Sequence, residues 1–287
     1  MNKFTRRTVI AAACAAAAMT FGPMSFAQQA PEKKDVTVAV GGKSLYYYLP
    51  LSIAEQLGYF KDEGLNVKIV DFQGGSRSLQ AVVGGSADVV SGAFEHTISM
   101  QAKKQPMTAF VLQGRAPQLA LVVSNKTMKD YKQLSDLKGK KVGVTAPGSS
   151  SQMVANFILK KGGLGPKDVA FIGVGSSSGA VSAIRSGQID ALINLDPVIT
   201  ILLKNGDAKL VADTRKVKES ESFFGGTMPA GCLYAPVSFI EKNPQTVQAL
   251  TNAIVRADEW LSKATPEEVA KVVPASYLMG NRDIYLA

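Results

Sequence analysis

The chain has 287 residues, of which 46% are hydrophobic and 19% are charged, so it can bury a sizeable core. This composition excludes a disordered chain, which would combine low hydrophobicity with a high charge fraction. Two cysteines and one histidine exclude a disulfide-stapled scaffold, a multi-cysteine zinc or iron–sulfur site and a multi-histidine metal site. The length predicts one large domain or two lobes of ordinary size, and the formal net charge is +9.

Residues 1–27 have the pattern of an export signal peptide. Three basic residues precede an apolar run from Val9 to Met19, and Ser25 and Ala27 provide the small residues of a cleavage site. The apolar run is well short of the roughly 20 residues that a membrane-spanning helix needs. Both the Sec and the twin-arginine export routes fit this segment. We therefore expect an exported, periplasmic protein with residues 28–35 as its N-terminal tail.

After this segment, short apolar runs alternate with helical patterns. Near-continuous apolar strands separated by helices are typical of an α/β fold with mostly parallel sheets that helices cover on both faces. The predicted strands are Val36–Val40, Val67–Phe72, Asp88–Ser91, Met107–Leu112, Leu119–Ser124, Lys141–Thr145, Val169–Val174, Ala191–Asn194 and Lys209–Ala212; the predicted helices are Pro50–Leu57, Ser78–Val83, Thr97–Lys103, Ser150–Lys161, Ala180–Arg185 and Val198–Asn205.

The middle of the chain contains an internal duplication. Shifting the sequence against itself by 102 residues, from Val40 to Val142, gives seven identities at one constant offset within about 50 residues, without a gap. The period is too long for a solenoid repeat, so it predicts two related α/β lobes. The matched pairs include Gly41 with Gly143, Val67 with Val169, Gly85 with Gly187 and Asp88 with Asp190.

The segments that follow the predicted strands are rich in glycine and serine. Open parallel sheets bind ligands at the carboxyl ends of their strands, and unpaired N–H groups at a helix start favour anions. Sharp turns need the same residue types without any ligand, which is the alternative for each single turn. The segments are 41–48, 74–77 and 92–97 in the first lobe, and 146–151, 175–179 and 194–196 in the second.

Several motifs in this order resemble one class of periplasmic solute-binding proteins, those of ABC importers for nitrate, taurine and aliphatic sulfonates. The class belongs to a superfamily that also contains thiamine-pyrimidine synthases. The resemblance extends from Val36 to about Leu261. Its residues are Leu51–Phe60 followed by Glu63–Val67, Gly74-Gly75-Ser76, Gly85 and Asp88, Asp136–Lys140, Gly143-Val144, Gly187 with Asp190-Ala191, and Asp196-Pro197.

The resemblance implies a type II periplasmic-binding-protein fold with two lobes and two crossover strands, Leu119–Ser124 and Met228–Ala235. It assigns residues 36–124 to the first lobe, 125–226 to the second, and 227–287 to a return into the first lobe with C-terminal helices. Members of the class continue for several tens of residues beyond the equivalent of Ala287. It further implies a monomer without catalysis, cofactor or metal, which binds a small-molecule ligand and hands it to an ABC permease.

The candidate ligand groups combine cations, aromatic rings and hydroxyls. A guanidinium from Arg77 or Arg115 can contact an anion in bidentate fashion, although most arginines face solvent. In an extended turn, alternation would aim Tyr46 and Tyr48 one way and Tyr47 the other. We expect a small organic anion or zwitterion to contact Ser44, Tyr46, Tyr48, Gly75, Ser76, Arg77, Glu95, His96, Arg115, Ser149, Ser150, Ser177 and Asp196.

Two of these residues have a structural alternative to the ligand role. His96, the single histidine, either donates to a ligand or is simply satisfied by hydrogen bonds at a helix start. Asp196 either accepts from a ligand amine or caps the helix after Pro197.

Other functions fit the sequence less well. The Gly175–Gly179 segment matches the G-x-S-x-G motif of a secreted serine hydrolase with Ser177 as nucleophile, but His96 precedes that serine instead of following it. The lysines and arginines are scattered, which argues against a nucleic-acid partner. A receptor that presents its ligand to a membrane sensor is not distinguished from a transport receptor.

Overall fold

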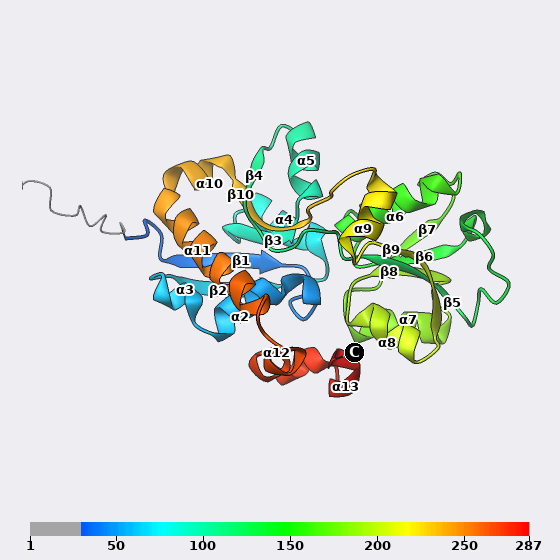
Figure 1. Ribbon diagram of the computed structural model, residues 1–287. Helices are drawn as coiled ribbons and strands as arrows, with labels where there is room; N and C mark the ends of the chain where they lie inside the picture. Colours follow the sequence, from blue (N-terminus) through cyan, green and yellow to red (C-terminus); the bar gives the residue numbers. More distant parts are fainter. Residues whose placement is uncertain (1–29, 287) are drawn as a thin grey trace, which may run out of the picture. The chain divides into compact units, whose positions relative to one another are not determined.

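The computed structural model describes residues 30–286, so the predicted export signal lies outside the described part of the chain. Two five-stranded sheets form the centre of the fold, and both belong to one unit, Pro31–Ala287 (Figure 1). The first sheet has the strand order β2-β1-β3-β10-β4. Its strands are β1 (Asp35–Val40), β2 (Asn66–Asp71), β3 (Val89–Ala93), β4 (Met107–Leu112) and β10 (Gly231–Pro236).

The second sheet repeats this topology in the order β7-β6-β8-β5-β9. In each sheet one strand, β10 or β5, runs antiparallel to both of its neighbours, and the others are parallel to one another. The predicted two-lobe α/β fold with mostly parallel sheets and two crossover strands is therefore confirmed. The strands are β5 (Ala120–Ser124), β6 (Lys141–Val144), β7 (Ala170–Gly173), β8 (Ala191–Asn194) and β9 (Ala208–Asp213).

The strand register corrects one detail of the predicted duplication. Val40 pairs with Asp71, 31 residues later, whereas Val144 pairs with Gly173, only 29 residues later. The first strands of the two lobes are therefore 104 residues apart in the sequence, whereas the second strands are 102 residues apart. An alignment of the two lobes thus needs a gap. The extra residues lie in the first lobe, between its first strand and its second.

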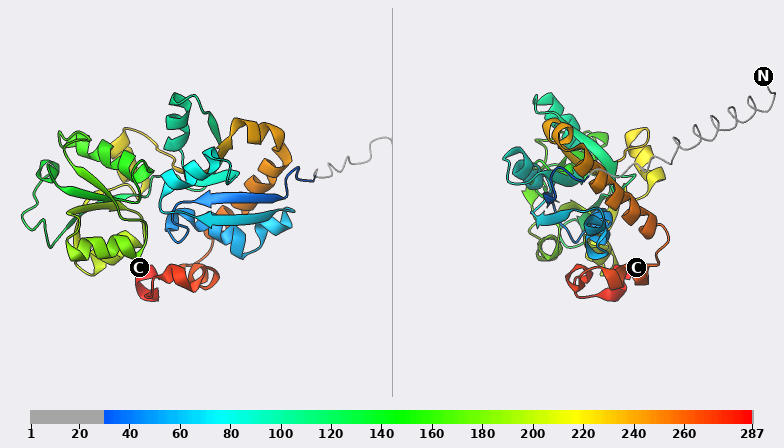
Figure 2. Two further views of the ribbon diagram at one scale, coloured as in Figure 1. Left: turned by 180° about the vertical axis from the view of Figure 1, so that it is seen from behind. Right: turned by 90° about the vertical axis from the view of Figure 1, so that its left-hand side faces the viewer.

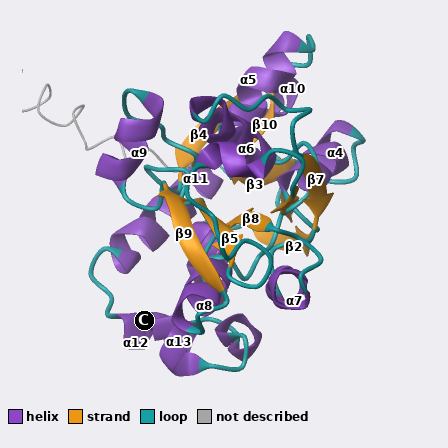
Figure 3. Ribbon diagram, turned by 90° about the vertical axis from the view of Figure 1, so that its right-hand side faces the viewer, coloured by secondary structure: helices purple, strands orange, loops and turns teal. Residues whose placement is uncertain are grey.

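Helices cover both faces of each sheet. In the second lobe α6 lies on one face, and α7 and α8 lie on the other (Figures 1 and 3). The helices of the first lobe are α2 (Leu49–Gln56), α3 (Tyr59–Asp62), α4 (Gly75–Val83), α5 (Glu95–Ala102), α10 (Val237–Lys242) and α11 (Pro244–Leu261); those of the second are α6 (Ser150–Lys161), α7 (Ser178–Ser186), α8 (Val198–Lys204) and α9 (Val217–Phe224).

The longest of these helices, α11, shows how the sequence builds the first lobe. Proline at its first position, Pro244, removes a backbone N–H that would have no partner there. Its inward face consists of fully buried apolar side chains at helical spacing, and this face packs against α2 and α3. The buried residues are Ala249, Leu250, Ala253, Ile254 and Ala257.

Two crossing segments connect the lobes, and backbone hydrogen bonds tie them together. The Gln118 N–H donates to the Thr214 carbonyl (3.1 Å), and the Thr214 N–H donates to the Leu119 carbonyl (2.8 Å). Because β5 pairs with β8 and β9, the chain enters the second lobe between Leu112 and Ala120. The predicted boundary after Ser124 placed this strand in the first lobe, where it does not pair.

The C-terminal segment contains α12 (Pro266–Val272), the 3-10 helix η3 (Ala275–Leu278) and α13 (Arg282–Leu286). Both views in Figure 2 show it as a separate layer at the edge of the two lobes. The α13 helix packs against α8 of the second lobe, while the Tyr285 carbonyl accepts a hydrogen bond from the Tyr46 hydroxyl of the first. Among residues 30–286, no helix combines the length and apolar character needed to cross a membrane.

Candidate functional site

A small cavity lies between the two lobes, at the carboxyl ends of the strands. Its volume is about 30 Å³, which is room for about one water-sized group. Among the described residues, its lining contains no aspartate, glutamate, lysine or arginine. The lining residues are Gly41, Tyr47, Tyr48, Gly75, Ala93, His96, Pro117, Leu119, Thr145, Ser149, Ser150, Ser151 and Leu195.

Three helices of the two lobes begin at this cavity. Gly75 is the first residue of α4, His96 the second of α5, and Ser150 the first of α6. The unpaired N–H groups and the helix dipole make each of these ends electropositive. Both α4 and α5 start earlier than predicted, at Gly75 and Glu95 instead of Ser78 and Thr97, and this brings their first turns to the cavity wall.

Direct hydrogen bonds hold the lobes against each other beside the cavity. The Ser76 N–H donates to Ser149 Oγ (3.0 Å), and Ser76 Oγ donates to the Pro147 carbonyl (2.9 Å). The Gly74 backbone is equally close, since a Cβ added there would lie 2.8 Å from the Ala146 Cβ. The structure is therefore a closed form, in which the predicted residues Gly75, Ser76, Ser149 and Ser150 come together.

Glu95 makes a further contact between the lobes. Ser150 Oγ donates a hydrogen bond of 2.8 Å to Glu95 Oε1, while Glu95 Oε2 is buried without a partner. Burial raises the pKa of this carboxyl group, and the hydrogen bonds from its own backbone and from Ser150 oppose that rise. An acid in this position serves as a hydrogen-bond acceptor whose charge is incompletely compensated.

His96 is almost fully buried in the cavity wall. Its Nδ1 shares a hydrogen bond of 2.9 Å with the hydroxyl of Tyr234, and its Cε1 lies against Gly75. Burial lowers the pKa of His96 to about 4, and the Gly148 carbonyl partly opposes this change. The side chain is therefore a neutral imidazole near pH 7, with hydrogen-bonding capacity left on Nε2.

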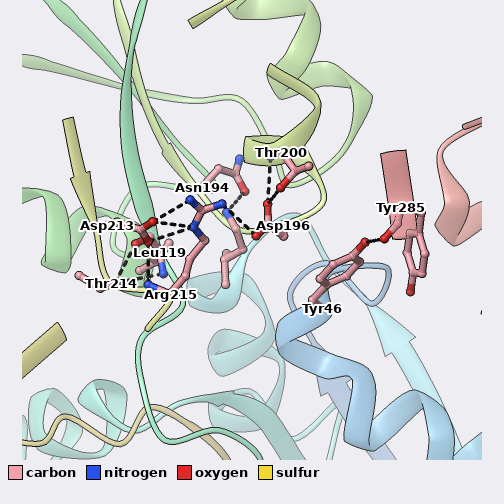
Figure 4. Close-up of polar contacts among 10 residues, drawn as sticks. Tyr46, Leu119, Asn194, Asp196, Thr200, Asp213, Thr214, Arg215 and Tyr285 are labelled. Carbon is pink, nitrogen blue, oxygen red and sulfur yellow. Dashed lines mark hydrogen bonds and ion pairs between the residues drawn. The ribbon is translucent and has the colours of Figure 1, made fainter. Parts of the chain in front are cut away.

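The three consecutive tyrosines do not alternate as predicted. Tyr46–Tyr48 form the 3-10 helix η1, in which successive side chains point about 120° apart instead of to opposite sides. As a result, Tyr47 and Tyr48 line the cavity together. Tyr46 points away and stacks edge-on against Tyr285, with ring centroids 4.8 Å apart (Figure 4).

Asp196 is engaged outside the cavity. Its Oδ1 accepts hydrogen bonds from both the backbone N–H and the hydroxyl of Thr200, so it caps α8 (Figure 4). Its Oδ2 accepts from Arg215 Nη1 (3.2 Å), and the same guanidinium makes a closer ion pair with Asp213 (2.7 Å). These hydrogen bonds and ion pairs raise the pKa of Arg215 and lower that of Asp213. The helix-capping alternative for Asp196 therefore agrees with these contacts.

The remaining predicted site residues lie outside the cavity lining. Arg77, Arg115 and Ser177 are exposed, and Ser44 is half-buried. In the 175–179 turn it is Ser176 that is buried, where it faces Gly42 of the first lobe. Ligand contacts from Arg77, Arg115, Ser44 and Ser177 stay predictions that this closed form does not test.

Sequence reasoning missed several residues that build the site. Thr145 and Ser151 share a buried hydrogen bond of 2.9 Å at the cavity wall, and the predicted glycine- and serine-rich segment already contained Ser151. Leu119 and Leu195 carried no chemical signal, because apolar residues next to strands are typical of any core. Tyr234 lies 138 residues from its partner His96, a distance that no local pattern spans.

A family model described as NMT1/THI5 like matches residues 46–269, well over half of the chain. The chain belongs to the NMT1/THI5-like family. Among curated relatives, YtlA of Bacillus subtilis, named as a candidate binding protein, is 25% identical over 276 residues, which are 95% of this chain and 79% of YtlA. The 4-amino-5-hydroxymethyl-2-methylpyrimidine phosphate synthase of Aspergillus parasiticus is 26% identical, over 83% of this chain and 71% of the enzyme.

Solved structures place this NMT1/THI5-like protein among periplasmic binding proteins in fold. A protein of Bordetella bronchiseptica is 61% identical, with a TM-score of 0.89 over 90% of this chain and 81% of its own. The alkanesulfonate-binding protein SsuA of Xanthomonas axonopodis, bound to MOPS, is 21% identical, with a TM-score of 0.67 over 88% and 84%. The nitrate-binding protein NrtA of Synechocystis is 18% identical, with a TM-score of 0.71 over 87% and 70%. The predicted resemblance to sulfonate- and nitrate-binding proteins is confirmed at the level of the fold.

Proposed function

We propose that this protein is a periplasmic receptor that captures a small organic anion or zwitterion between its lobes and delivers it to an ABC importer permease. The observation that carries the proposal is the enclosed cavity at which the helix starts of both lobes converge. Electropositive helix starts favour an anionic group, and the neutral hydroxyls of Ser149, Ser150 and Thr145 add hydrogen-bond donors. Neither lobe provides this set of donors by itself.

Closure supplies the mechanism of capture. A ligand that contacts Gly75 in the first lobe and Ser150 in the second stabilises the closed form only through the contacts that the open form lacks. Those contacts add to the hydrogen bonds that Ser76 and Glu95 already make across the lobes. Micromolar affinity needs about 8 kcal/mol, which a few charge-assisted hydrogen bonds and an aromatic contact from Tyr47 or Tyr48 supply.

The comparisons support a receptor more than an enzyme. SsuA and NrtA, with which the chain shares its fold, are named as binding proteins. The fungal relatives are synthases at 23–26% identity, so an enzyme is the alternative to a receptor. A hydrolase with the exposed Ser177 as its nucleophile would need His96 as its base. That histidine belongs to the other lobe and is buried against Tyr234.

Ligand screening of the purified mature protein tests the proposal. Thermal shift followed by calorimetry would compare nitrate, alkanesulfonates, carboxylates, amino acids and pyrimidines. We expect at least one anionic or zwitterionic class to raise the melting temperature and to bind with 1:1 stoichiometry. Gly75→Val, which places a side chain against His96, should abolish that binding while the protein stays folded by circular dichroism.

The hydrolase alternative has a distinct outcome. Ester hydrolysis that Ser177→Ala abolishes, or the absence of binding by every ligand class, would overturn the receptor. In the receptor, Ser177→Ala leaves ligand release and rebinding reversible, and the ligand is recovered chemically unchanged.

A further inference from the structure

A second, larger hollow lies beside the cavity and is lined by both lobes. This groove has a volume of about 580 Å³, within the range of pockets that hold organic ligands. It is mostly apolar, and two of its side chains, Ile98 and Phe157, are 59% and 41% exposed. Its walls are α5 with Glu95, Ile98, Ser99 and Ala102, α6 with Met153, Val154 and Phe157, and the segment 224–228, which leads from the end of α9 toward β10.

A hydrogen bond between the lobes joins a residue of the cavity to a residue of the groove. Ser150 lines the cavity, Glu95 lines the groove, and Ser150 Oγ donates to Glu95 Oε1 between them. Along α6, Ser150 and Ser151 line the cavity, whereas Met153, Val154 and Phe157 line the groove. Since Glu95 and Ser150 belong to different lobes, this wall opens whenever the lobes separate.

The cavity and the groove fit different parts of a ligand. The cavity takes about one water-sized group, so an organic ligand with a carbon skeleton does not fit there as a whole. The groove is roughly twenty times larger, but its lining is mostly apolar, and of the three helix starts at the cavity it shares that of α5, at Glu95. A ligand with a small anionic end and an apolar body matches both hollows.

Glu95 adds a requirement for a positive group at the junction. Its carboxyl group is more than nine-tenths buried, Oε1 already accepts from Ser150, and Oε2 has no hydrogen-bond partner. An unpaired buried acceptor is costly, and an ammonium group placed on it forms a charge-assisted hydrogen bond. A carboxylate or sulfonate at the same place would be repelled, so the anionic end of a ligand belongs in the cavity and the cationic group at Glu95.

Resting on the proposed receptor function, we infer that the ligand is an apolar amino acid or a similar amphipathic zwitterion. Its carboxylate occupies the cavity at the starts of α4 and α6. Its ammonium group donates to Glu95 Oε2, and its apolar substituent lies in the groove between Ile98 and Phe157. The groove therefore sets the preferred length of the substituent, and Glu95 sets the preference for an amine.

Calorimetry on the purified mature protein tests the roles of the groove and of Glu95 with a series of ligands of increasing chain length, here called the ladder. Alanine, norvaline and norleucine extend the substituent by methylene groups, and we expect about fourfold tighter binding for each buried methylene. Hexanoate lacks the amine of norleucine and pentylamine lacks its carboxylate. Each should bind at least tenfold more weakly than norleucine.

Three variants assign the effects to residues. Phe157→Ala should reduce the gain in affinity from alanine to norleucine. Glu95→Gln should remove most of the preference for norleucine over hexanoate. Val255→Ala, a truncation of a similarly exposed apolar residue on α11, should change neither. Melting curves of the variants without ligand establish that each is folded.

The outcomes separate this inference from the receptor function. A short anion such as nitrate or ethanesulfonate that binds equally well in the parent protein, Phe157→Ala and Glu95→Gln, with no gain along the ladder, overturns the zwitterion assignment and leaves the receptor intact. A ladder that persists unchanged in Phe157→Ala overturns the role of the groove. If neither the ladder nor any other ligand class binds, the receptor function itself fails.

Discussion

The two lobes share one strand order but bring different chemistry to the cavity between them. The first lobe contributes aromatic and titratable groups, namely Tyr47, Tyr48 and His96, with Glu95 at the edge. The second contributes Thr145 and the serines at the start of α6. The duplicated sheets therefore preserve a frame, while the segments after the strands diverge, as expected where binding residues lie on loops held by a rigid scaffold. Substitutions at four places test this difference between the lobes.

The largest effect is expected where the first strand of each lobe ends. Gly41 follows β1, and a Cβ built there would lie 2.4 Å from the carbonyl carbon of Gly74, whereas the corresponding Thr145 carries a full side chain. Because backbone cannot move aside cheaply, Gly41→Ala should lower the free energy of unfolding by about 3 kcal/mol. Chemical denaturation measures this change. Gly165→Ala, whose Cβ meets only ordinary contacts, is the control, and equal stability of the two variants would contradict the expectation.

The second effect is a pH dependence that the single histidine should give to the first lobe. His96 titrates near 6.5 when unfolded and about 4 when folded, so between these values the unfolded chain binds more protons. The free energy of unfolding should therefore fall as the pH drops from 6.5 to 4, by up to about 3 kcal/mol.

Denaturation of the protein and of His96→Gln at several pH values isolates this contribution. The comparison is needed because Asp258, whose pKa burial raises to about 6, acts with the opposite sign: its contribution is present below its ordinary pKa and is lost as the pH rises toward 6. Parallel pH profiles for the two proteins would show that His96 is not the group responsible.

The third effect concerns the charges that the second lobe keeps outside the cavity. Arg215 is mostly buried between Asp196 and Asp213, so Arg215→Leu leaves two carboxylates without their cation. We expect a loss of about 2 kcal/mol in the free energy of unfolding. The more exposed pair of Arg185 with Asp207 is the matched control, and Arg185→Leu should cost well under 1 kcal/mol. Similar losses for both variants would refute the distinction.

The smallest effect lies in the contact between the lobes. Ser76→Ala removes the hydrogen bond to the Pro147 carbonyl and should destabilise the closed form by about 1 kcal/mol, which weakens ligand binding about fivefold. Calorimetry with the ligand found in the screen measures the change, and small-angle X-ray scattering reports the open fraction. Ser262→Ala, which loses only a local hydrogen bond to Glu259, should bind normally. Unchanged affinity in Ser76→Ala would show that this contact does not support closure.

Local pattern was enough to predict the elements of the frame. The β4 strand, the α6 helix and the β8 strand have the predicted bounds, because each combines a clear period with a sharp turn at its end. Helix starts were less accurate. The first turn of α4 is Gly75–Arg77, where glycine and serine resemble a loop, yet Gly74 in a positive-φ conformation (92°) lets the helix begin at once.

The direction of side chains was harder to predict than the elements. The Tyr46–Tyr48 run fits both an extended turn and a 3-10 helix, and the choice between them decides which rings face the cavity. Arg77 and Arg115 follow strands and lie exposed in this closed form, so their ligand contacts stay predictions, while Arg215 carried no motif and forms ion pairs with Asp196 and Asp213. Long flexible side chains follow the nearest partner charge more than their position in the chain.

The sequence by itself determined the class of fold, the duplication of the lobes and the glycine- and serine-rich segments that approach the cavity, because period, turn chemistry and repetition are local or regular properties. Only the tertiary structure decided that Glu95 meets Ser150, that His96 meets Tyr234, and that a polar cavity borders an apolar groove. Those contacts join residues dozens of positions apart on different helices and strands. Their geometry depends on how whole lobes pack, which no window of sequence contains.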